Sequence, residues 1–373
     1  MNISAASGSC TVFLCGDVMT GRGIDQILRR PSRPELYEEA VSSAAEYVAL
    51  AEHANGPIPR AVDDAYVWGA ALEELERLKP SARIINLETS VTTSDEALLK
   101  GINYRMHPAN VGVLAAARID CAVLANNHVL DWGESGLRET LDTLTSVHVR
   151  VAGAGRTQSE AEQPAAMDAS AGHRVLVFAF GAADSGVPSD WWATANRPGV
   201  NWIGDYSPRT VSRVVKLIAR HKRRGDIAVV SIHWGSNWGY AIPPEHRAFA
   251  RDLIDNASAD VVYGHSSHHV KAIEAYHDRL ILYGCGDFLN DYEGIHGPKN
   301  LRDDLTLMYF PTLDLATGVL IDLEVVPLLI RNFRLQRPTA GDARWLRDTV
   351  DRECRRFGGG LVMREDSLHL DWH

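Results

Sequence analysis

The sequence predicts an α/β fold in which helices flank a sheet of buried strands. Two observations support this prediction: apolar runs of strand length recur along the chain, and segments with helical periodicity lie between them. Strands that helices bury on both faces read as continuous apolar runs, as these do. In chain order, the predicted strands are 11–15, 82–87, 121–125, 175–180, 227–232, 261–263 and 280–283. The predicted helices are 66–78, 110–117, 135–144, 208–218 and 245–253.

Three further segments depart from this alternation. Residues 31–65 contain four prolines and are interpreted as an insertion between the first two strands. Residues 184–206 contain three tryptophans and two prolines, which predicts a long aromatic loop. Beyond residue 300, strands are expected over 305–310, 319–326 and 331–335 and a helix over 343–356. Because no linker or repeat separates the parts, we expect a domain over 1–300 and a C-terminal extension over 301–373 that packs on the same unit.

The composition excludes several classes of protein. The chain has 38 basic and 48 acidic residues, a net charge of −10, and its longest basic cluster covers only residues 221–224. We therefore expect no nucleic-acid partner. The five cysteines form no C-x-x-C pair, which indicates reduced thiols and a cytoplasmic location. Neither a signal-peptide pattern nor an apolar stretch of about 18 residues is present, so we expect no membrane partner.

Residues of metal-binding type follow five of the predicted strands. They are Asp17, Glu88, Asn127-His128, His233 and His265. In open α/β sheets the carboxyl ends of the strands meet at one edge, where ligands bind. A single aspartate after a strand is usually a helix cap, and a single histidine is usually a hydrogen-bonded residue. Five such positions together favour a divalent metal site, with Mn, Zn, Fe or Ca as the candidate ions.

The order of these motifs carries a family resemblance. The pattern GD…NLE…ANNHxxDxG…HWG…GHxxH…GD resembles the CapA family, which is named for poly-γ-glutamate capsule synthesis and belongs to the calcineurin-like metallophosphoesterase superfamily. The resemblance runs from about Cys15 to Tyr292. It implies a four-layer αββα sandwich with a metal site at the sheet edge.

The resemblance also implies roles for individual residues. Glu88, Asn127, His233 and His265 match ligands of one metal, and His128 matches the histidine that acts on the substrate. Asp17 and either His268 or His269 match ligands of a second metal. Met19 stands where the superfamily has another histidine ligand, and a thioether is a poor ligand for a hard ion. We therefore expect one well-occupied metal and a weak or absent second one.

Three classes of function are compatible with these features, and we predict the first of them. The first is a metal-dependent peptide epimerase, since the CapA-like family is similar to a lasso-peptide epimerase that inverts the Cα of a C-terminal tryptophan. Its peptide substrate is expected to be a ribosomal precursor. Its acid and base candidates are His128, His296 and Asp287, and its substrate-binding candidates are Arg22, Trp191, Trp192 and Trp234. The second is a capsule or poly-γ-glutamate protein, or a γ-glutamyl amide hydrolase. The third is a non-enzymatic binding module; a metallophosphoesterase is a weaker alternative.

Overall fold

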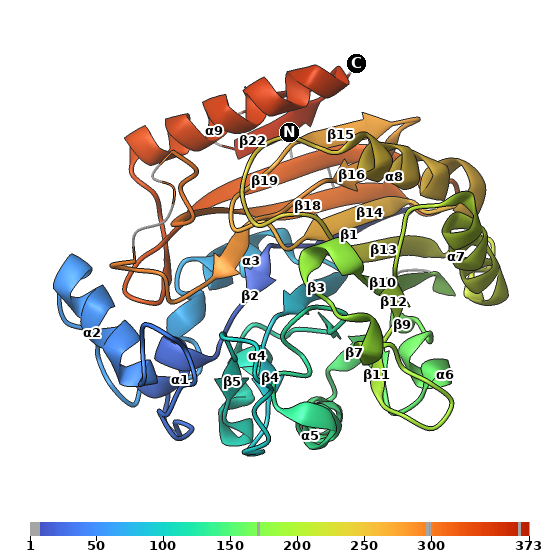
Figure 1. The fold of residues 1–373 in the computed structure, drawn as a ribbon. Coiled ribbons are helices and arrows are strands. Elements are labelled where there is room, and N and C mark those ends of the chain that lie inside the picture. The colour runs from blue at the N-terminus through green and yellow to red at the C-terminus, as the bar shows by residue number, and fades with distance from the viewer. Residues whose placement is uncertain (1–7, 170–171, 296–297, 299, 365–366, 373) are drawn as a thin grey trace.

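The computed structural model describes residues 8–169, 172–295, 298, 300–364 and 367–372. Within them, two large sheets form the centre of the molecule (Figure 1). The first sheet contains β1 (Ser9–Phe13), β2 (Asp17–Val18), β3 (Ala82–Leu87), β6 (Cys121–Val123), β7 (Arg150–Ala152), β17 (Asp287–Leu289), β18 (Leu305–Asp314), β19 (Leu320–Ile330), β20 (Leu335–Gln336), β21 (Gly360–Arg364) and β22 (Ser367–Asp371). The second contains β9 (Ala165–Asp168), β10 (Arg174–Ala182), β12 (Trp202–Ile203), β13 (Ile227–His233), β14 (Val261–His265), β15 (Ile273–Tyr276) and β16 (Arg279–Leu282).

The helices lie outside the sheets. They are α1 (Arg22–Ile27), α2 (Ala44–Asn55), α3 (Ala71–Leu78), α4 (Gly112–Ala116), α5 (Gly133–Ser146), α6 (Gln158–Ala161), α7 (Pro208–His221), α8 (Pro244–Ala257) and α9 (Ala340–Cys354). Two small sheets add β4 (Ser90–Val91) with β5 (Arg105–Met106), and β8 (Ala154–Gly155) with β11 (Gly199–Val200).

Three apolar cores define four layers. Successive side chains of a strand point to opposite faces of its sheet. In β3, Ile85 therefore joins the core shared with α1 to α5, while Ile84 joins the core between the two sheets. In β13, Val229 faces that same central core, and Val230 packs with residues of α7 and α8. The four-layer αββα arrangement that the family resemblance implies is thus confirmed (Figure 1).

Most predicted elements are present, and the exceptions have local causes. The helix expected over 66–78 is interrupted at Gly69, whose φ is 43°, and continues as α3. The strand expected over 331–335 is wrong except for Leu335, because Asn332 and Phe333 form a turn with positive φ. The presumed insertion 31–65 contains helix α2. After residue 300, β18 pairs with β1 and β19 with β18, so the C-terminal residues extend the first sheet.

Gly16 allows two chain segments to meet at the edge of the first sheet. The Asp17 N–H donates to the Gly286 carbonyl over 2.8 Å, which brings the Gly16-Asp17 and Gly286-Asp287 pairs together. A Cβ on Gly16 would lie 2.0 Å from that same carbonyl oxygen. Backbone on both sides leaves no flexible side chain to move, so only glycine fits here.

Gly16→Ala should therefore destabilise the protein by about 3 kcal/mol, as severe overpacking of a core does. Chemical denaturation measures this as a lower midpoint. Gly8→Ala is the matched control, because a Cβ on Gly8 meets nothing within 4 Å. Equal midpoints for the two variants would contradict the proposed close approach.

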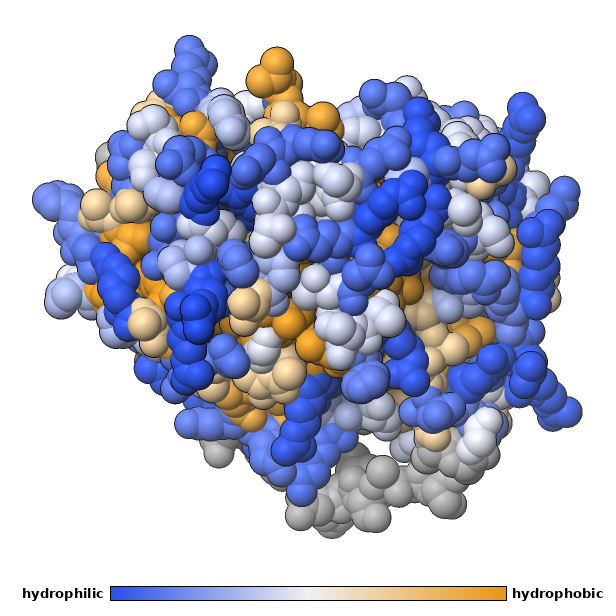
Figure 2. All heavy atoms as spheres, turned by 90° about the horizontal axis from the view of Figure 1, so that it is seen from below, coloured by the Kyte–Doolittle hydropathy of each residue, from blue (hydrophilic) through white to orange (hydrophobic). Residues whose placement is uncertain are grey.

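The surface shows no unusual concentration of one residue type on the face seen from below. Figure 2 shows this face, which carries α5, as mostly hydrophilic with small groups of hydrophobic residues between the charged ones. Among the described residues, no helix has both the length and the apolar character needed to cross a membrane. The five cysteines are free and buried.

Candidate metal centre

Strand register brings the predicted ligands to one edge of the molecule. In the first sheet, Asp17 of β2 lies opposite Asn86 of β3 and opposite Asp287 of β17. In the second sheet, His233 of β13 lies opposite His265 of β14. All these strands are paired in parallel, so their carboxyl ends open at the same edge.

The turn after β6 delivers two further residues to this edge. The Asn126 side chain donates to Asn86 Oδ1 at 3.1 Å and to the Leu87 carbonyl at 2.9 Å. Its own oxygen accepts the His128 N–H at 3.1 Å. Asn126 thus fixes the turn that carries Asn127 and His128.

The donor atoms lie at separations that suit a metal ion. Asp17, His233 and His265 are buried and offer ligand atoms that all lie within 4.8 Å of one another. His233 Nε2 is 3.1 Å from Asn127 Oδ1 and 4.0 Å from Glu88 Oε1. Ligands about 2.1 Å from a central ion lie roughly 3–3.5 Å apart, so small movements of these groups would form a coordination shell. Glu88 Oε2 is also buried without a hydrogen-bond partner, as a ligand atom would be. These residues therefore fit a divalent ion.

His265 has a second contact that bears on its role. Its Nδ1 lies 2.9 Å from His233 Nδ1 and 3.8 Å from Asp17 Oδ1, and its Nε2 lies 2.6 Å from Ser231 Oγ. His265 therefore borders the donor atoms and also orients the His233 ring. Hydrogen bonds of this kind fix the tautomer of a ligating imidazole.

Burial sets the protonation of these donors. It raises the pKa of Asp17 to about 7, helped by the nearby Asp287, and raises that of Glu88 well above its usual value, helped by Asp17. Burial also lowers the pKa of His265 to about 3 and that of His233 well below its usual value. At neutral pH the imidazoles are neutral, which is their metal-binding form.

We expect metal affinity to fall as the pH drops, because protons compete with the ion for the carboxylates. A carboxyl group with a pKa of about 7 is mostly ionised at pH 8 and mostly protonated at pH 5.5. Asp17 alone should lower the Mn²⁺ affinity by about 30-fold over this interval. Equilibrium dialysis at the two pH values measures the effect. An affinity that changes less than threefold would show that Asp17 does not ligate the ion.

A second group of polar residues lies beside the first. His268 Nδ1 is 2.9 Å from Asp287 Oδ1, and Asp287 Oδ2 accepts from Asn290 at 2.9 Å. By contrast, His269 Nε2 accepts the Gly239 N–H at 3.0 Å. The structure therefore favours His268 over His269 as the residue facing the metal centre. Asp287 thus orients His268, and its role as an acid or base stays a prediction.

His128 lies beside the metal-type donors and is held by a carboxylate. Its Nδ1 lies 2.7 Å from Asp131 Oδ2, and its Nε2 lies 3.7 Å from Glu88 Oε1. Burial lowers its pKa to about 4, although Asp131 opposes this shift. The Lys100 ammonium lies 3.4 Å from His128 Nδ1 and 2.7 Å from Asp131 Oδ1. Sequence reasoning missed Lys100, because no strand or motif precedes it.

Two predicted substrate-binding residues have other roles. Trp234 is buried, donates its indole N–H to the Tyr283 carbonyl at 3.0 Å and stacks on His246, so it is a core residue. Arg22 is buried as well, with its guanidinium bonded to Asp291, Glu38 and Tyr47. Most of its N–H donors therefore bond within the protein, so the prediction that Arg22 binds the substrate directly is wrong.

The two other predicted tryptophans differ in exposure, and Trp191 is buried. The Lys100 ammonium lies 5.3 Å from the Trp191 ring centre, which connects Trp191 to the His128 region. Trp192 is 38% exposed and packs against Trp202. His296, predicted as the second acid or base, lies outside the described residues.

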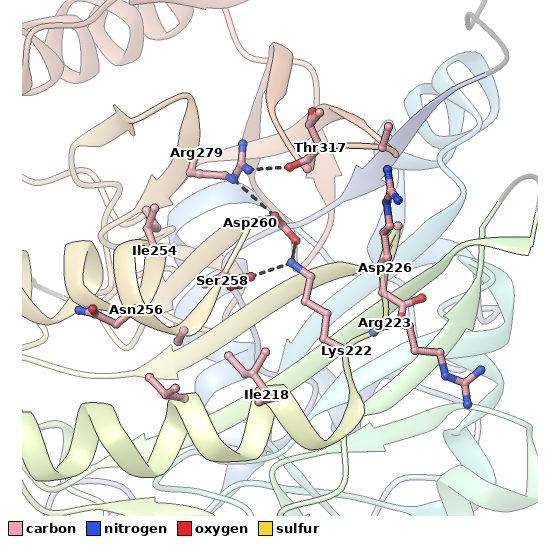
Figure 3. A pocket seen from close by; sticks show the side chains of 18 of the residues that line it. Ile218, Lys222, Arg223, Asp226, Ile254, Asn256, Ser258, Asp260, Arg279 and Thr317 are labelled. Atoms are coloured by element: carbon pink, nitrogen blue, oxygen red, sulfur yellow. Dashed lines mark hydrogen bonds and ion pairs between the residues drawn. The ribbon is translucent and has the colours of Figure 1, made fainter.

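A separate pocket of about 470 Å³ lies at the opposite ends of the strands. Figure 3 shows that Lys222 and Arg279 both point at Asp260, which precedes β14. Lys222 also donates to the Ser258 carbonyl just after α8. These cations neutralise a buried carboxylate and the C-terminus of a helix. Because this pocket lies at the opposite ends of the strands, it is separate from the metal centre.

Comparison with known proteins places the chain in a family. A probable polyglutamine synthesis accessory protein of Mycobacterium tuberculosis is 47% identical over 96% of this chain and 94% of its own length. The PGA biosynthesis protein CapA of Bacillus subtilis is 26% identical over 79% of this chain and 66% of its own length. A Mycoplasma pneumoniae phosphatase structure covers 91% of this chain and 96% of its own, with 12% identity and a TM-score of 0.41. The model of the bacterial capsule synthesis protein PGA_cap matches residues 11–292, and the chain belongs to that family.

Proposed function

We propose that this protein is a metal-dependent enzyme of poly-γ-glutamate synthesis that acts on a γ-glutamyl amide bond. The names of its relatives support the pathway, since they refer to polyglutamine synthesis and PGA biosynthesis. The observation that carries the enzymatic part is the adjacency of two groups: a buried set of metal-type donors and the His128–Asp131 pair. A buried neutral histidine held by a carboxylate beside such donors favours an acid–base role over binding alone.

The chemistry follows from the positions of these residues. A bound divalent ion would be held by Asp17, Glu88, Asn127 and His233, with His265 beside them, and it would supply Lewis-acid polarisation of a carbonyl. His128 is neutral at pH 7, so it accepts the proton of the water that attacks the γ-carbonyl carbon. As the C–N bond breaks, His128 returns this proton to the leaving amine. Asp131 keeps the ring in the orientation that both transfers require.

The charge of the chain limits how a polyanion binds. A net charge of −10 disfavours extended contact with an acidic polymer. Local recognition of one end of the polymer is compatible with that charge, because Lys100 lies at the His128 side of the site and is only partly buried. The proposal is therefore cleavage or transfer at a chain end rather than along the polymer. The buried free cysteines fit a reducing compartment such as the cytoplasm.

The test is to incubate the Mn²⁺- or Zn²⁺-loaded protein with a γ-linked glutamate oligomer and to follow its length by mass spectrometry. Shortened or transferred oligomers that disappear on chelation support the proposal. An unchanged oligomer, together with rapid hydrolysis of bis-nitrophenyl phosphate, would favour a phosphoesterase instead.

Epimerisation of a peptide C-terminus stays a prediction, and mass spectrometry of a peptide substrate tests it. Inversion in D₂O would add one deuterium to an intact peptide, whereas amide cleavage would not preserve its length. None of the described contacts favours epimerisation over cleavage.

A further inference from the structure

Two tyrosines occupy the region beside Met19, where the superfamily pattern has a second metal ligand. Tyr104 and Tyr292 place their hydroxyl oxygens 3.1 Å apart. The Tyr292 hydroxyl also donates to Met19 Sδ at 3.8 Å. Met19 follows Asp17 by two residues, so this hydroxyl pair adjoins the metal centre.

The rings of this pair lie between the two histidines of the site. The Tyr104 ring meets the His128 ring edge to face, with centroids 4.5 Å apart. The Tyr292 ring meets the His268 ring in the same way at 5.3 Å. Tyr104 and Met19 are buried, whereas Tyr292 is only partly buried. Tyr292 is therefore the more exposed residue of the pair.

The Tyr292 hydroxyl donates only to a weak acceptor, the sulfur of Met19. A thioether sulfur is a weak hydrogen-bond acceptor. The Tyr292 hydroxyl therefore gives up only a weak hydrogen bond to Met19 when it donates to a ligand oxygen instead. Tyr104 then donates to the Tyr292 oxygen, and such a chain of hydroxyl groups strengthens the outer hydrogen bond.

A buried arginine packs behind the two tyrosine rings. The Arg22 guanidinium carbon lies 4.5 Å from the Tyr104 ring centre and 5.8 Å from that of Tyr292. Asp291 and Glu38 hold Arg22 in this place. Because these two carboxylates offset its charge, Arg22 fixes the positions of the two tyrosine rings rather than attracting an anion itself.

We infer that the Tyr104–Tyr292 pair, supported by Arg22, forms a subsite for an oxyanion of the substrate in the region of the missing second-metal ligand. The identity of the ligand rests on the proposed function, and the expected ligand is a carboxylate of the γ-linked glutamate chain. Tyr292 donates directly to one of its oxygens, and Tyr104 positions Tyr292.

The test measures binding of two oxyanion probes, the dipeptide γ-glutamylglutamate and inorganic phosphate, to the metal-loaded protein by calorimetry. Tyr292→Phe should weaken binding of the dipeptide by roughly 10- to 100-fold, the worth of a hydrogen bond to a charged group. Tyr104→Phe should weaken it less, and metal content should stay the same in both variants. Tyr66→Phe is the matched control, since its partly buried hydroxyl donates to the Asn332 carbonyl at 3.0 Å and contacts neither Arg22 nor the tyrosine pair.

Three results would overturn the inference. They are equal dipeptide affinity in all variants, loss of metal in Tyr292→Phe, or no binding of either probe to the wild-type protein. If phosphate alone binds, and its binding depends on Tyr292, the subsite stands while the carboxylate assignment falls. Probe binding that depends on Tyr292 without any cleavage of γ-linked oligomers supports the subsite and contradicts only the proposed reaction.

Discussion

Replacing His233 with alanine should abolish stoichiometric metal binding. His233 Nε2 lies within 4.0 Å of both Asn127 Oδ1 and Glu88 Oε1, so its loss removes a central donor. Even groups that only orient a metal ligand contribute about 10- to 100-fold in affinity, so loss of the ligand itself should cost more than 100-fold. Elemental analysis of the dialysed variant measures the effect against about one ion per wild-type chain.

His269→Ala is the matched control for this loss. His269 is also buried and neutral, but its imidazole accepts from the Gly239 N–H and lies against Trp238. It should keep the wild-type metal content. Equal metal content in the His233 and His269 variants, with both folded by circular dichroism, would overturn the ligand assignment.

The fold and the main donors could be predicted from the sequence because both depend on local pattern. Apolar runs define buried strands. The residue that follows such a strand lies at the edge of the sheet, and this position does not depend on contacts with residues distant in the sequence. Asp17, His233 and His265 follow from this rule alone, and register in neighbouring strands then brings His233 beside His265.

Residues placed by contacts distant in sequence could not be predicted. Lys100 and Tyr104 lie in a loop without periodicity, and Tyr104 meets Tyr292 across 188 positions. Arg22 could be read as an exposed cation because its partners Glu38 and Asp291 are not adjacent in the chain.

Trp234 shows a different error. The sequence predicts Trp234, which directly follows His233, as a substrate-binding residue, but successive side chains at a strand end point to opposite faces. The face opposite His233 is the core of α7 and α8, where Trp234 packs. Adjacency in sequence is therefore a poor guide to a shared site at the end of a strand.

His128→Ala should remove proton transfer while the metal stays bound. His128 is 3.7 Å from Glu88 through Nε2 and is held by Asp131 through Nδ1, so it stands beside the donors without being needed among them. Turnover of the γ-linked oligomer should fall by about 10²- to 10⁴-fold, the usual contribution of general acid–base catalysis. Asp131→Asn should give a smaller loss, because the ring stays present but is no longer held in the productive tautomer. Single-turnover assays with parallel metal analysis separate the two effects.

If His128→Ala retained wild-type turnover with the metal bound, the proton carrier would have to be another group. If it lost both turnover and metal, His128 would belong among the ligands.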